Sequence, residues 1–278
     1  MYTLNCKGRL LSLKQPLVMG ILNYTRDSFY QGSRLPDKEA VLKSAIHMAE
    51  AGVDIIDIGA QSTRPGSTRI SADEEIEKLA GLIPEIIKST DKIISIDTYH
   101  ASTAAAMVEA GAHIVNDISG GTMDPQMIDT VGKLGVPYIC MHIKGTPENM
   151  QQHTDYRDIL GEVLQYFIER TDKCRKAGIH DIIIDPGFGF AKTIDQNYYL
   201  LKNLAAFKIF DLPILAGLSR KSSIYKTLQI TPEEALNGTT VLNTIALMNG
   251  AHILRVHDVK EAREAVSLFK VYTEATGN

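Results

Sequence analysis

The chain has 278 residues, of which 44% are hydrophobic and 22% charged, and its formal net charge is −4. This is the composition of an ordinary globular protein, and the small negative charge argues against nucleic acid or an anionic membrane as a partner. A small-molecule substrate is therefore expected.

The first fourteen residues are interrupted by charged and polar side chains, so they predict neither a signal peptide nor a membrane span. A cytoplasmic location is the default expectation. The three cysteines, Cys6, Cys140 and Cys174, are widely spaced and form no Cys-x-x-Cys motif, which indicates reduced thiols. Cys140 lies within an apolar run and is interpreted as a small core residue.

Residues 1–15 precede the first apolar run and are expected to form a short hairpin. Eight short apolar runs then follow at residues 17–22, 55–58, 93–96, 113–115, 138–141, 181–184, 214–218 and 253–256. A half-exposed strand alternates apolar and polar residues, whereas a strand covered on both faces reads as a nearly continuous apolar stretch. These runs are unbroken, which predicts a parallel sheet.

Segments with helical spacing separate the runs. The clearest is 156–177, where apolar residues recur at intervals of four and define one helix face. Three capping pairs mark helix starts: Ser71 with Glu74, Thr231 with Glu234, and Asp258 with Glu261.

Eight strand-helix repeats in a chain of this length predict an α/β fold, a (β/α)8 TIM barrel. We expect residues 1–278 to form one domain, with the amino-terminal hairpin closing the barrel floor. An open doubly wound sheet is the alternative. Its glycine-rich dinucleotide fingerprint is missing after the first run, where residues 23–28 follow, so the closed barrel is favoured.

Polar residues stand at the ends of the runs, and in a TIM barrel the carboxyl ends of all strands meet at one face. We therefore predict one active-site face that includes Asn23, Asp97, Asn116, His142, Asp185, Ser219, Arg255 and His257.

Two carboxylates, Asp97 and Asp185, follow isoleucine-rich runs, where an isolated carboxylate is costly to bury. Together with Asn116 they could hold an amino-substituted nitrogen heterocycle through paired hydrogen bonds. The alternative for either carboxylate is an internal ion pair with an arginine of the barrel.

Arg255 and His257 are two residues apart on the last strand and share one side of it, which is suited to phosphate. Residues 219–223 offer cationic groups and hydroxyls before a predicted helix, and suit another anion. His142 is evenly balanced between a core role and a site role.

Two connections, residues 23–35 and 60–70, look longer and more polar than a plain connection needs. They follow the first and second strands and are expected to act as lids over the barrel mouth, with solvated surface loops as the alternative.

Six motifs in these segments resemble those of the dihydropteroate synthases, and the resemblance runs from about residue 17 to residue 269. They are Met19-Gly20-Ile21-Leu22-Asn23 with Thr25 and Asp27-Ser28-Phe29; Ser62-Thr63-Arg64-Pro65-Gly66; Met141-His142 with Gly145-Thr146-Pro147; Asp185-Pro186-Gly187-Phe188-Gly189-Phe190; Ser219-Arg220-Lys221-Ser222; and Arg255-Val256-His257-Asp258.

The resemblance implies the condensation of a hydroxymethyl-dihydropterin diphosphate with 4-aminobenzoate, which releases diphosphate and forms dihydropteroate. It places the pterin against Asp97, Asn116, Met141, Asp185 and Lys221. It places the diphosphate against Asn23, Thr63, Arg255 and His257, with Mg2+ near Asn23. It places aminobenzoate beside Phe29, Pro65, Phe190, Lys221 and Ser222. Catalytic roles fall to Asp27, Arg64, Asp97, Asp185 and Lys221, and the resemblance also implies a homodimer.

The sequence departs from the family pattern at Arg26, where proline is common, at residues 31–33 and at residues 60–61. None of these positions has a direct role above. The runner-up is a pterin-binding methyltransferase that passes a folate methyl group to a corrinoid protein; it needs no diphosphate site, so Arg255 and His257 argue against it. A catalytically silent pterin-binding protein and a Schiff-base aldolase acting through Lys221 are further alternatives.

Overall fold

An eight-stranded parallel sheet forms the centre of the computed structural model, which describes residues 2–24, 38–61 and 69–276. Its strands are β3 (Leu17–Asn23), β4 (Ile55–Gly59), β5 (Ile93–Asp97), β6 (Ile114–Asp117), β7 (Tyr138–Met141), β8 (Ile182–Asp185), β9 (Leu215–Ala216) and β10 (Ile253–Val256). They follow the order β8-β7-β6-β5-β4-β3-β10-β9. A parallel bridge from Ile184 to Ile214 joins the two edges. The predicted TIM barrel is confirmed.

Both faces of the strands are buried, which is why their sequences are unbroken apolar runs. On β4, Ile56 and Ile58 belong to the cluster under the surrounding helices, whereas Ile55 belongs to a cluster inside the barrel. Every strand of the barrel contributes to that inner cluster, two residues from β3 and one from each of the others: Leu17 and Met19, then Ile55, Ile93, Ile114, Ile139, Ile183, Leu215 and Ile253. Side chains two residues further along each strand face the same way, toward the barrel mouth.

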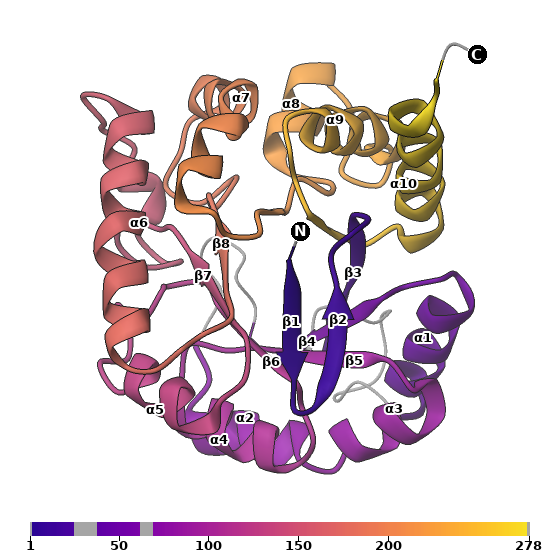
Figure 1. Cartoon of the computed structure of the whole chain (residues 1–278), viewed down its shortest axis with the longest axis vertical. Helices are drawn as coiled ribbons and strands as arrows, with labels where there is room; N and C mark the ends of the chain where they lie inside the picture. The colour runs from indigo at the N-terminus through magenta and orange to yellow at the C-terminus, as the bar shows by residue number, and fades with distance from the viewer. Residues whose placement is uncertain (1, 25–37, 62–68, 277–278) are drawn as a thin grey trace.

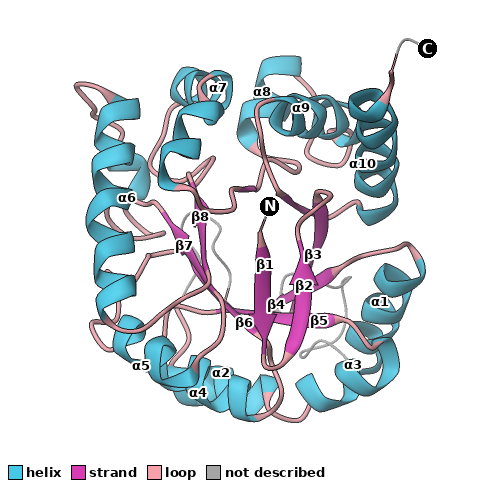
Figure 2. Ribbon diagram, in the orientation of Figure 1, coloured by secondary structure: helices cyan, strands magenta, loops and turns pink. Residues whose placement is uncertain are grey.

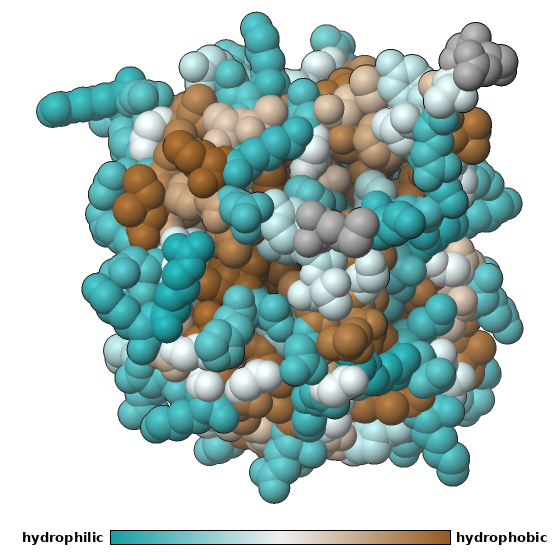
Figure 3. Space-filling view, in the orientation of Figure 1, coloured by the Kyte–Doolittle hydropathy of each residue, from teal (hydrophilic) through white to brown (hydrophobic). Residues whose placement is uncertain are grey.

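The amino-terminal hairpin closes the barrel floor, as predicted. It consists of β1 (Thr3–Cys6) and β2 (Arg9–Ser12), paired antiparallel from Thr3 opposite Ser12 to Cys6 opposite Arg9. Its apolar residues Leu4, Cys6 and Leu13 join the inner cluster of the barrel. Figure 1 shows the hairpin in front of the barrel strands. The face around it carries hydrophilic side chains at its rim and patches of hydrophobic surface nearer the centre (Figure 3).

Helices surround the strands on the outside of the barrel (Figure 2). They are α1 (Lys38–Glu50), α2 (Ala72–Leu79), α3 (Ile83–Thr90), α4 (Ala101–Glu109), α5 (Met127–Leu134), α6 (Ile159–Lys176), α7 (Ile194–Lys202), α8 (Ser222–Leu228), α9 (Leu236–Met248) and α10 (Val259–Glu274), with short 3-10 helices η1 (Met150–Gln152) and η2 (Leu204–Phe210). The helix predicted over 156–177 is α6. Among the described residues, no helix is both long enough and apolar enough to cross a bilayer.

One of the three predicted helix caps is confirmed. Ser71 caps α2 in a reciprocal capping box, with the Glu74 backbone N–H donating to the Ser71 hydroxyl at 3.2 Å and the Ser71 N–H donating to the Glu74 carboxylate at 3.0 Å.

The other two capping pairs do not form as predicted, although the helix start predicted at Asp258 is confirmed. The Thr231 N–H does donate to the Glu234 carboxylate at 2.9 Å, but these residues form a turn and α9 begins only at Leu236. Asp258 occupies the N-cap position of α10 without a side-chain capping bond. Its carboxylate instead accepts two hydrogen bonds from Arg220, at 2.9 and 2.7 Å, because a charged bidentate pair is stronger than a cap.

Candidate active site

The carboxyl ends of the strands bring most of the predicted site residues to one face of the barrel. Asn23 ends β3, Asp97 ends β5, Met141 ends β7 and Asp185 ends β8, while Asn116 and Arg255 lie within β6 and β10. Phe190, Ser219, Lys221, Ser222 and His257 follow β8, β9 and β10. Five predicted residues lie outside the described residues, namely Asp27, Phe29, Thr63, Arg64 and Pro65.

A buried ion-pair network forms the floor of the site. The Arg255 guanidinium donates from Nε to Asp57 at 2.7 Å and from Nη2 to Asp97 at 2.6 Å. Asn116 donates from Nδ2 to the same Asp57 oxygen at 2.9 Å. The ion-pair alternative foreseen for Asp97 is therefore realised, and it places Asp97 and Asn116 in one network with Arg255.

Asp57 is a site residue that the sequence analysis missed. It lies within β4, two residues after Ile55 of the inner cluster, and is 1% exposed. Its Oδ1 atom is buried without a hydrogen-bond partner in the structure. The signal was a charged residue inside an apolar run, at the same inward spacing that relates Ile114 to Asn116 and Ile253 to Arg255.

Burial sets the charge state of the carboxylates in the floor. It raises the pKa of Asp97 to about 7, an effect that Arg255 opposes and the negative charge of Asp57 reinforces. Burial likewise raises the pKa of Asp185, whereas Lys221 and the Gly187 N–H, which donates to Asp185 at 2.8 Å, lower it. A hydrogen-bond donor on a bound molecule would therefore favour the charged form of these carboxylates.

The end of β4 requires glycine because it passes close to Asp97. A Cβ atom on Gly59 would lie 2.9 Å from the Asp97 carbonyl oxygen and 3.0 Å from its Cβ atom. These contacts are too short for a side chain, so Gly59 lets β4 and β5 bring their ends together at the site.

Lys221 reaches the site from the N-cap position of α8. Its ammonium group donates to the Phe188 carbonyl and lies 4.9 Å from the centre of the Phe190 ring. Burial lowers the pKa of Lys221 to about 8, Asp185 raises it and Arg255 lowers it. Asp185, Lys221 and Phe190 thus lie together on the side of the mouth formed by β8 and β9, as predicted.

An apolar cluster covers the next part of the mouth. It joins Phe190 and Met141 to residues from the loops after β5, β6 and β7, namely Tyr99, Ile118, Ile143 and Met150. A flat aromatic ligand above the polar floor would therefore meet an apolar wall.

His257 follows β10 and pairs with Ser219. The Ser219 hydroxyl lies 3.0 Å from His257 Nδ1 and accepts the His257 backbone N–H at 3.2 Å. Arg220, which we had grouped with the anion-binding residues, points elsewhere: besides Asp258 it donates to the carbonyls of Pro232 and Glu233 at 2.9 and 2.7 Å. That part of the prediction is wrong, because Arg220 holds the loop after β9 to the starts of α9 and α10.

His142 is buried beneath this face, 2% exposed, with its Nδ1 atom 2.9 Å from the Lys192 ammonium group. Lys192 was not recognised from the sequence, where it follows the glycine-rich turn after β8 without any distinguishing spacing.

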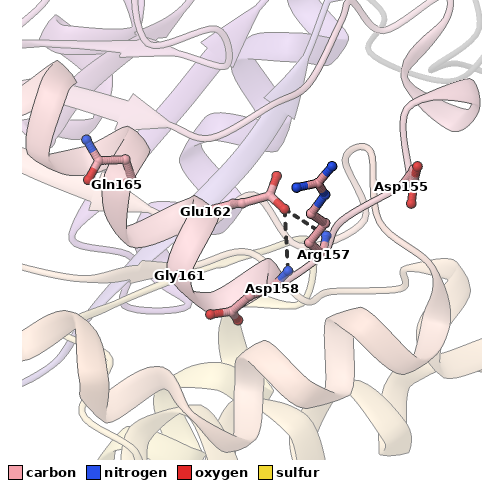
Figure 4. A pocket seen from close by; sticks show the side chains of 6 residues that line it. All are labelled: Asp155, Arg157, Asp158, Gly161, Glu162 and Gln165. Carbon is pink, nitrogen blue, oxygen red and sulfur yellow. Dashed lines mark hydrogen bonds between the residues drawn. The ribbon is translucent and has the colours of Figure 1, made fainter.

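A surface hollow lies at the start of α6, lined by Asp155, Arg157, Asp158, Gly161, Glu162 and Gln165 (Figure 4). Its central carboxylate is already used, since Glu162 pairs with Lys144 at 2.7 Å and accepts the Arg157 N–H at 2.8 Å. The strand-end floor, with its buried charges, is the better candidate site.

Comparisons with known proteins identify relatives that match most of the chain. A family model described as pterin binding enzyme matches residues 19–257. The dihydropteroate synthase of Escherichia coli strain K12 is 41% identical over 274 residues, which are 98% of this chain and 97% of that protein.

Two solved structures of dihydropteroate synthase from Xanthomonas albilineans share the fold. The structure with 4-aminobenzoic acid has a TM-score of 0.92 at 36% identity, and covers 99% of each chain. The complex with 7,8-dihydropteroate has a TM-score of 0.89 at 34% identity, over 99% of this chain and 100% of the other.

The chain therefore belongs to the family of pterin-binding enzymes. Within that family it belongs to the dihydropteroate synthases, and the resemblance noted in the sequence is confirmed.

Proposed function

We propose that the chain condenses (7,8-dihydropterin-6-yl)methyl diphosphate with 4-aminobenzoate to give 7,8-dihydropteroate and diphosphate. The observation that carries this proposal is the buried network in which Arg255 bridges Asp57 and Asp97 beside Asn116. The network offers carboxylate and amide groups to an amino-substituted heterocycle at the same end of the barrel as the apolar cluster that contains Phe190 and Met141.

The pterin would lie on this floor, held by Asp97, Asn116 and Asp185, with Lys221 and Met141 at its sides. Asp97 and Asp185 can each accept hydrogen bonds from ring N–H and amino groups. Because both pKa values are raised by burial, a donor from the pterin would stabilise the charged carboxylates.

The diphosphate would lie toward β3 and β10, near Asn23 and His257, with Arg255 between it and the pterin. Thr63, Arg64 and Asp27 are proposed to complete this part of the site from the two lids. The positive charge of Arg255 favours the anion that forms as the leaving group departs.

The reaction would begin with cleavage of the carbon–oxygen bond, whose electron pair leaves with the diphosphate. The electron-rich pterin ring spreads the positive charge left on the exocyclic carbon, and the carboxylates of the floor stabilise it. The amine nitrogen of aminobenzoate then forms the new carbon–nitrogen bond and releases a proton. When the new bond forms, the nitrogen becomes a positively charged arylammonium group. Such a group is strongly acidic, so no strong general base is needed to remove its proton.

Aminobenzoate would lie beside Phe190, with its carboxylate toward Ser222 at the start of α8. Phe29 and Pro65 are proposed to cover it when the lids close, which would position the weakly basic amine and exclude water. The apolar cluster that contains Phe190 and Met141 supports this position.

Magnesium is proposed to bind near Asn23. This residue ends β3 at the barrel mouth, and a carboxamide oxygen is a ligand that Mg2+ accepts. The described residues contain no group of three or more His, Cys, Asp or Glu side chains able to hold a metal, which suits an ion bound mainly by water and substrate phosphate. When bound, the ion would neutralise charge on the departing diphosphate.

We also propose that the protein is a homodimer located in the cytoplasm. Val241, Ile245 and Met248 form an exposed apolar stripe on α9, 50%, 39% and 53% exposed, and α9 packs against α10. On α10, Leu268, Val271 and Tyr272 are 72%, 67% and 66% exposed. Two such adjacent stripes suit a self-complementary interface. The cytoplasmic location is supported by three cysteines that are buried and free.

The deciding experiment supplies the pterin diphosphate, Mg2+ and 4-aminobenzoate, and measures diphosphate release and dihydropteroate formation together. Equal amounts of both products are expected. If the protein binds the pterin diphosphate but forms no dihydropteroate, the proposed reaction is wrong.

A further inference from the structure

His142 and Lys192 form a buried pair beneath the turn that carries Phe190. They are 2% and 4% exposed. The Lys192 ammonium group lies 2.9 Å from His142 Nδ1, and donates to the carbonyls of Gly187 at 3.0 Å and Phe190 at 2.9 Å. An ammonium group has three protons, so these partners use all of its donors.

The lysine is the donor of the pair, because its amino group also faces two backbone carbonyls. Burial and the positive charges of Lys192 and Lys144 lower the pKa of His142 well below its usual value, so the imidazole is neutral and its Nδ1 atom accepts. Burial lowers the pKa of Lys192 to about 7, an effect that Asp185 opposes and the charges of Lys221 and Lys144 reinforce. Two backbone carbonyls and an imidazole therefore hold the Lys192 ammonium group.

The Lys192 bonds fix a tight turn over residues 187–190. The Phe190 N–H donates to the Gly187 carbonyl at 3.1 Å, and Gly187 and Gly189 have φ values of +71° and +82°. A Cβ atom on Gly187 would lie 2.0 Å from the His142 carbonyl oxygen. The turn is thus pressed against the end of β7, and no side chain fits between them.

The opposite side of the same turn faces the site. The Phe188 carbonyl accepts a hydrogen bond from Lys221, whose ammonium group also lies over the Phe190 ring. Asn197 adds a further tether by accepting the Gly189 N–H at 2.6 Å. Lys192 on the inner side and Lys221 on the site side therefore hold the turn between them.

We propose that His142 and Lys192 are positioning residues that fix the Phe190 ring for the aromatic amine. Neither residue touches substrate; both act through the turn. This inference rests on the proposed position of aminobenzoate beside Phe190, and it adds that affinity for the amine depends on a buried lysine beneath that residue.

The test measures the KM for 4-aminobenzoate at saturating pterin diphosphate, and separately the Kd for pterin diphosphate. Lys192→Met removes three donors, which leaves the Phe190 carbonyl without this partner and the Gly187 carbonyl with the Phe190 N–H alone, so the KM is expected to rise about tenfold and the pterin Kd to change much less. A residue that merely supported folding would lower kcat and the thermal midpoint and leave the KM unchanged.

Two variants of His142 test the same role if Lys192→Met does not fold. His142→Asn keeps an acceptor near the Nδ1 position, whereas His142→Leu removes it, so the KM should rise more in His142→Leu. The matched control is Lys202→Met, an exposed lysine on α7, which should leave both constants unchanged.

Phe190→Ala tests the proposed position of aminobenzoate separately from the positioning role of His142 and Lys192. If Phe190→Ala leaves the KM for aminobenzoate unchanged, the proposed position of that substrate is wrong. If Phe190→Ala raises the KM but Lys192→Met and His142→Leu do not, or raise the pterin Kd equally, the positioning role is overturned while the proposed function stands.

Discussion

Arg255 and Asp57 are joined by a hydrogen bond of 2.7 Å, although Asp57 lies in the middle of a strand whose every residue is buried. Arg255 shares its charge between this carboxylate and Asp97, so three strands of the barrel are joined by one guanidinium. Removal of one partner leaves a buried charge uncompensated, and this is more costly than the loss of the bond itself.

Asp57→Ala should therefore destabilise the protein. We expect a loss of about 3 kcal/mol in the free energy of unfolding, measured by urea denaturation, because Arg255 and Asn116 lose a shared acceptor. Asp57→Asn keeps an oxygen acceptor and should lose less. Equal stability of Asp57→Ala and the wild type would show that Arg255 does not depend on Asp57.

The burial of Glu75 should make the stability of the protein depend on pH. This α2 residue is fully buried, and burial raises its pKa to about 7, while the hydrogen bond from Thr98 at 2.7 Å lowers it. The folded protein then binds a proton that the unfolded chain has released, so stability is lost as pH rises from about 4.5 to about 7.

In the wild type, the free energy of unfolding should fall by about 1–3 kcal/mol between pH 4.5 and pH 8 because of Glu75, and Glu75→Gln should abolish this fall. The measurement is chemical denaturation at a series of pH values. Glu77→Gln, at an exposed position of the same helix, is the control and should leave the slope unaltered. An unaltered slope in Glu75→Gln would assign the pH dependence to other groups.

Lys221→Ala should lower turnover on the order of a hundredfold, because it removes a cation placed beside Asp185 and Phe190. Asp185→Asn should also lower turnover strongly. Steady-state kinetics with both substrates measures the effect, and circular dichroism checks that the barrel persists. Lys226→Ala, on the exposed side of α8, is the matched control. Wild-type rates in Lys221→Ala or Asp185→Asn would remove that residue from the site.

Arg220 belongs to one of the site motifs, but we expect it to stabilise the fold and not to bind substrate. Arg220→Met should lower the free energy of unfolding by about 1–2 kcal/mol, since it breaks a partly buried bidentate pair with Asp258. The KM for pterin diphosphate should remain close to the wild-type value. A large rise in that KM would return Arg220 to the anion-binding residues.

The proposed homodimer predicts that one charge on the α9 stripe disrupts assembly. Ile245→Asp should shift the mass measured by light scattering from that of two chains to that of one, because an unpaired carboxylate is costly to bury in an apolar interface. Leu10→Asp places the same charge on the exposed hairpin and should not change the mass. A wild-type protein that runs as a monomer would rule out the dimer.

The strand positions could be predicted because a strand that is buried on both faces has an unbroken apolar sequence. Seven of the eight runs match their strands closely, whereas the run over 214–218 yields only the two-residue β9. There the chain enters a turn in which the Lys221 N–H donates to the Leu218 carbonyl at 3.3 Å, so only Leu215 and Ala216 pair with β10. Nothing in the apolar pattern records where the pairing ends.

The roles of residues that pair with distant parts of the sequence could not be predicted. Asp258 looks like a helix cap in its own segment, but Arg220, 38 residues earlier, takes its carboxylate. His142 had no role for the same reason: its partner Lys192 lies 50 residues away. Asp57 differs, because the two-residue spacing from Ile55 does predict an inward carboxylate.

The closure of the barrel has a consequence for its motions. Neighbouring strands elsewhere pair through two to five residues, but within the described part of the chain β8 and the residue before β9 meet through one bridge, Ile184 to Ile214. Amide hydrogen exchange should therefore be fastest along this seam. Asp185 follows one edge of this seam and Lys221 follows the other, so local opening of the seam would move these two site residues apart.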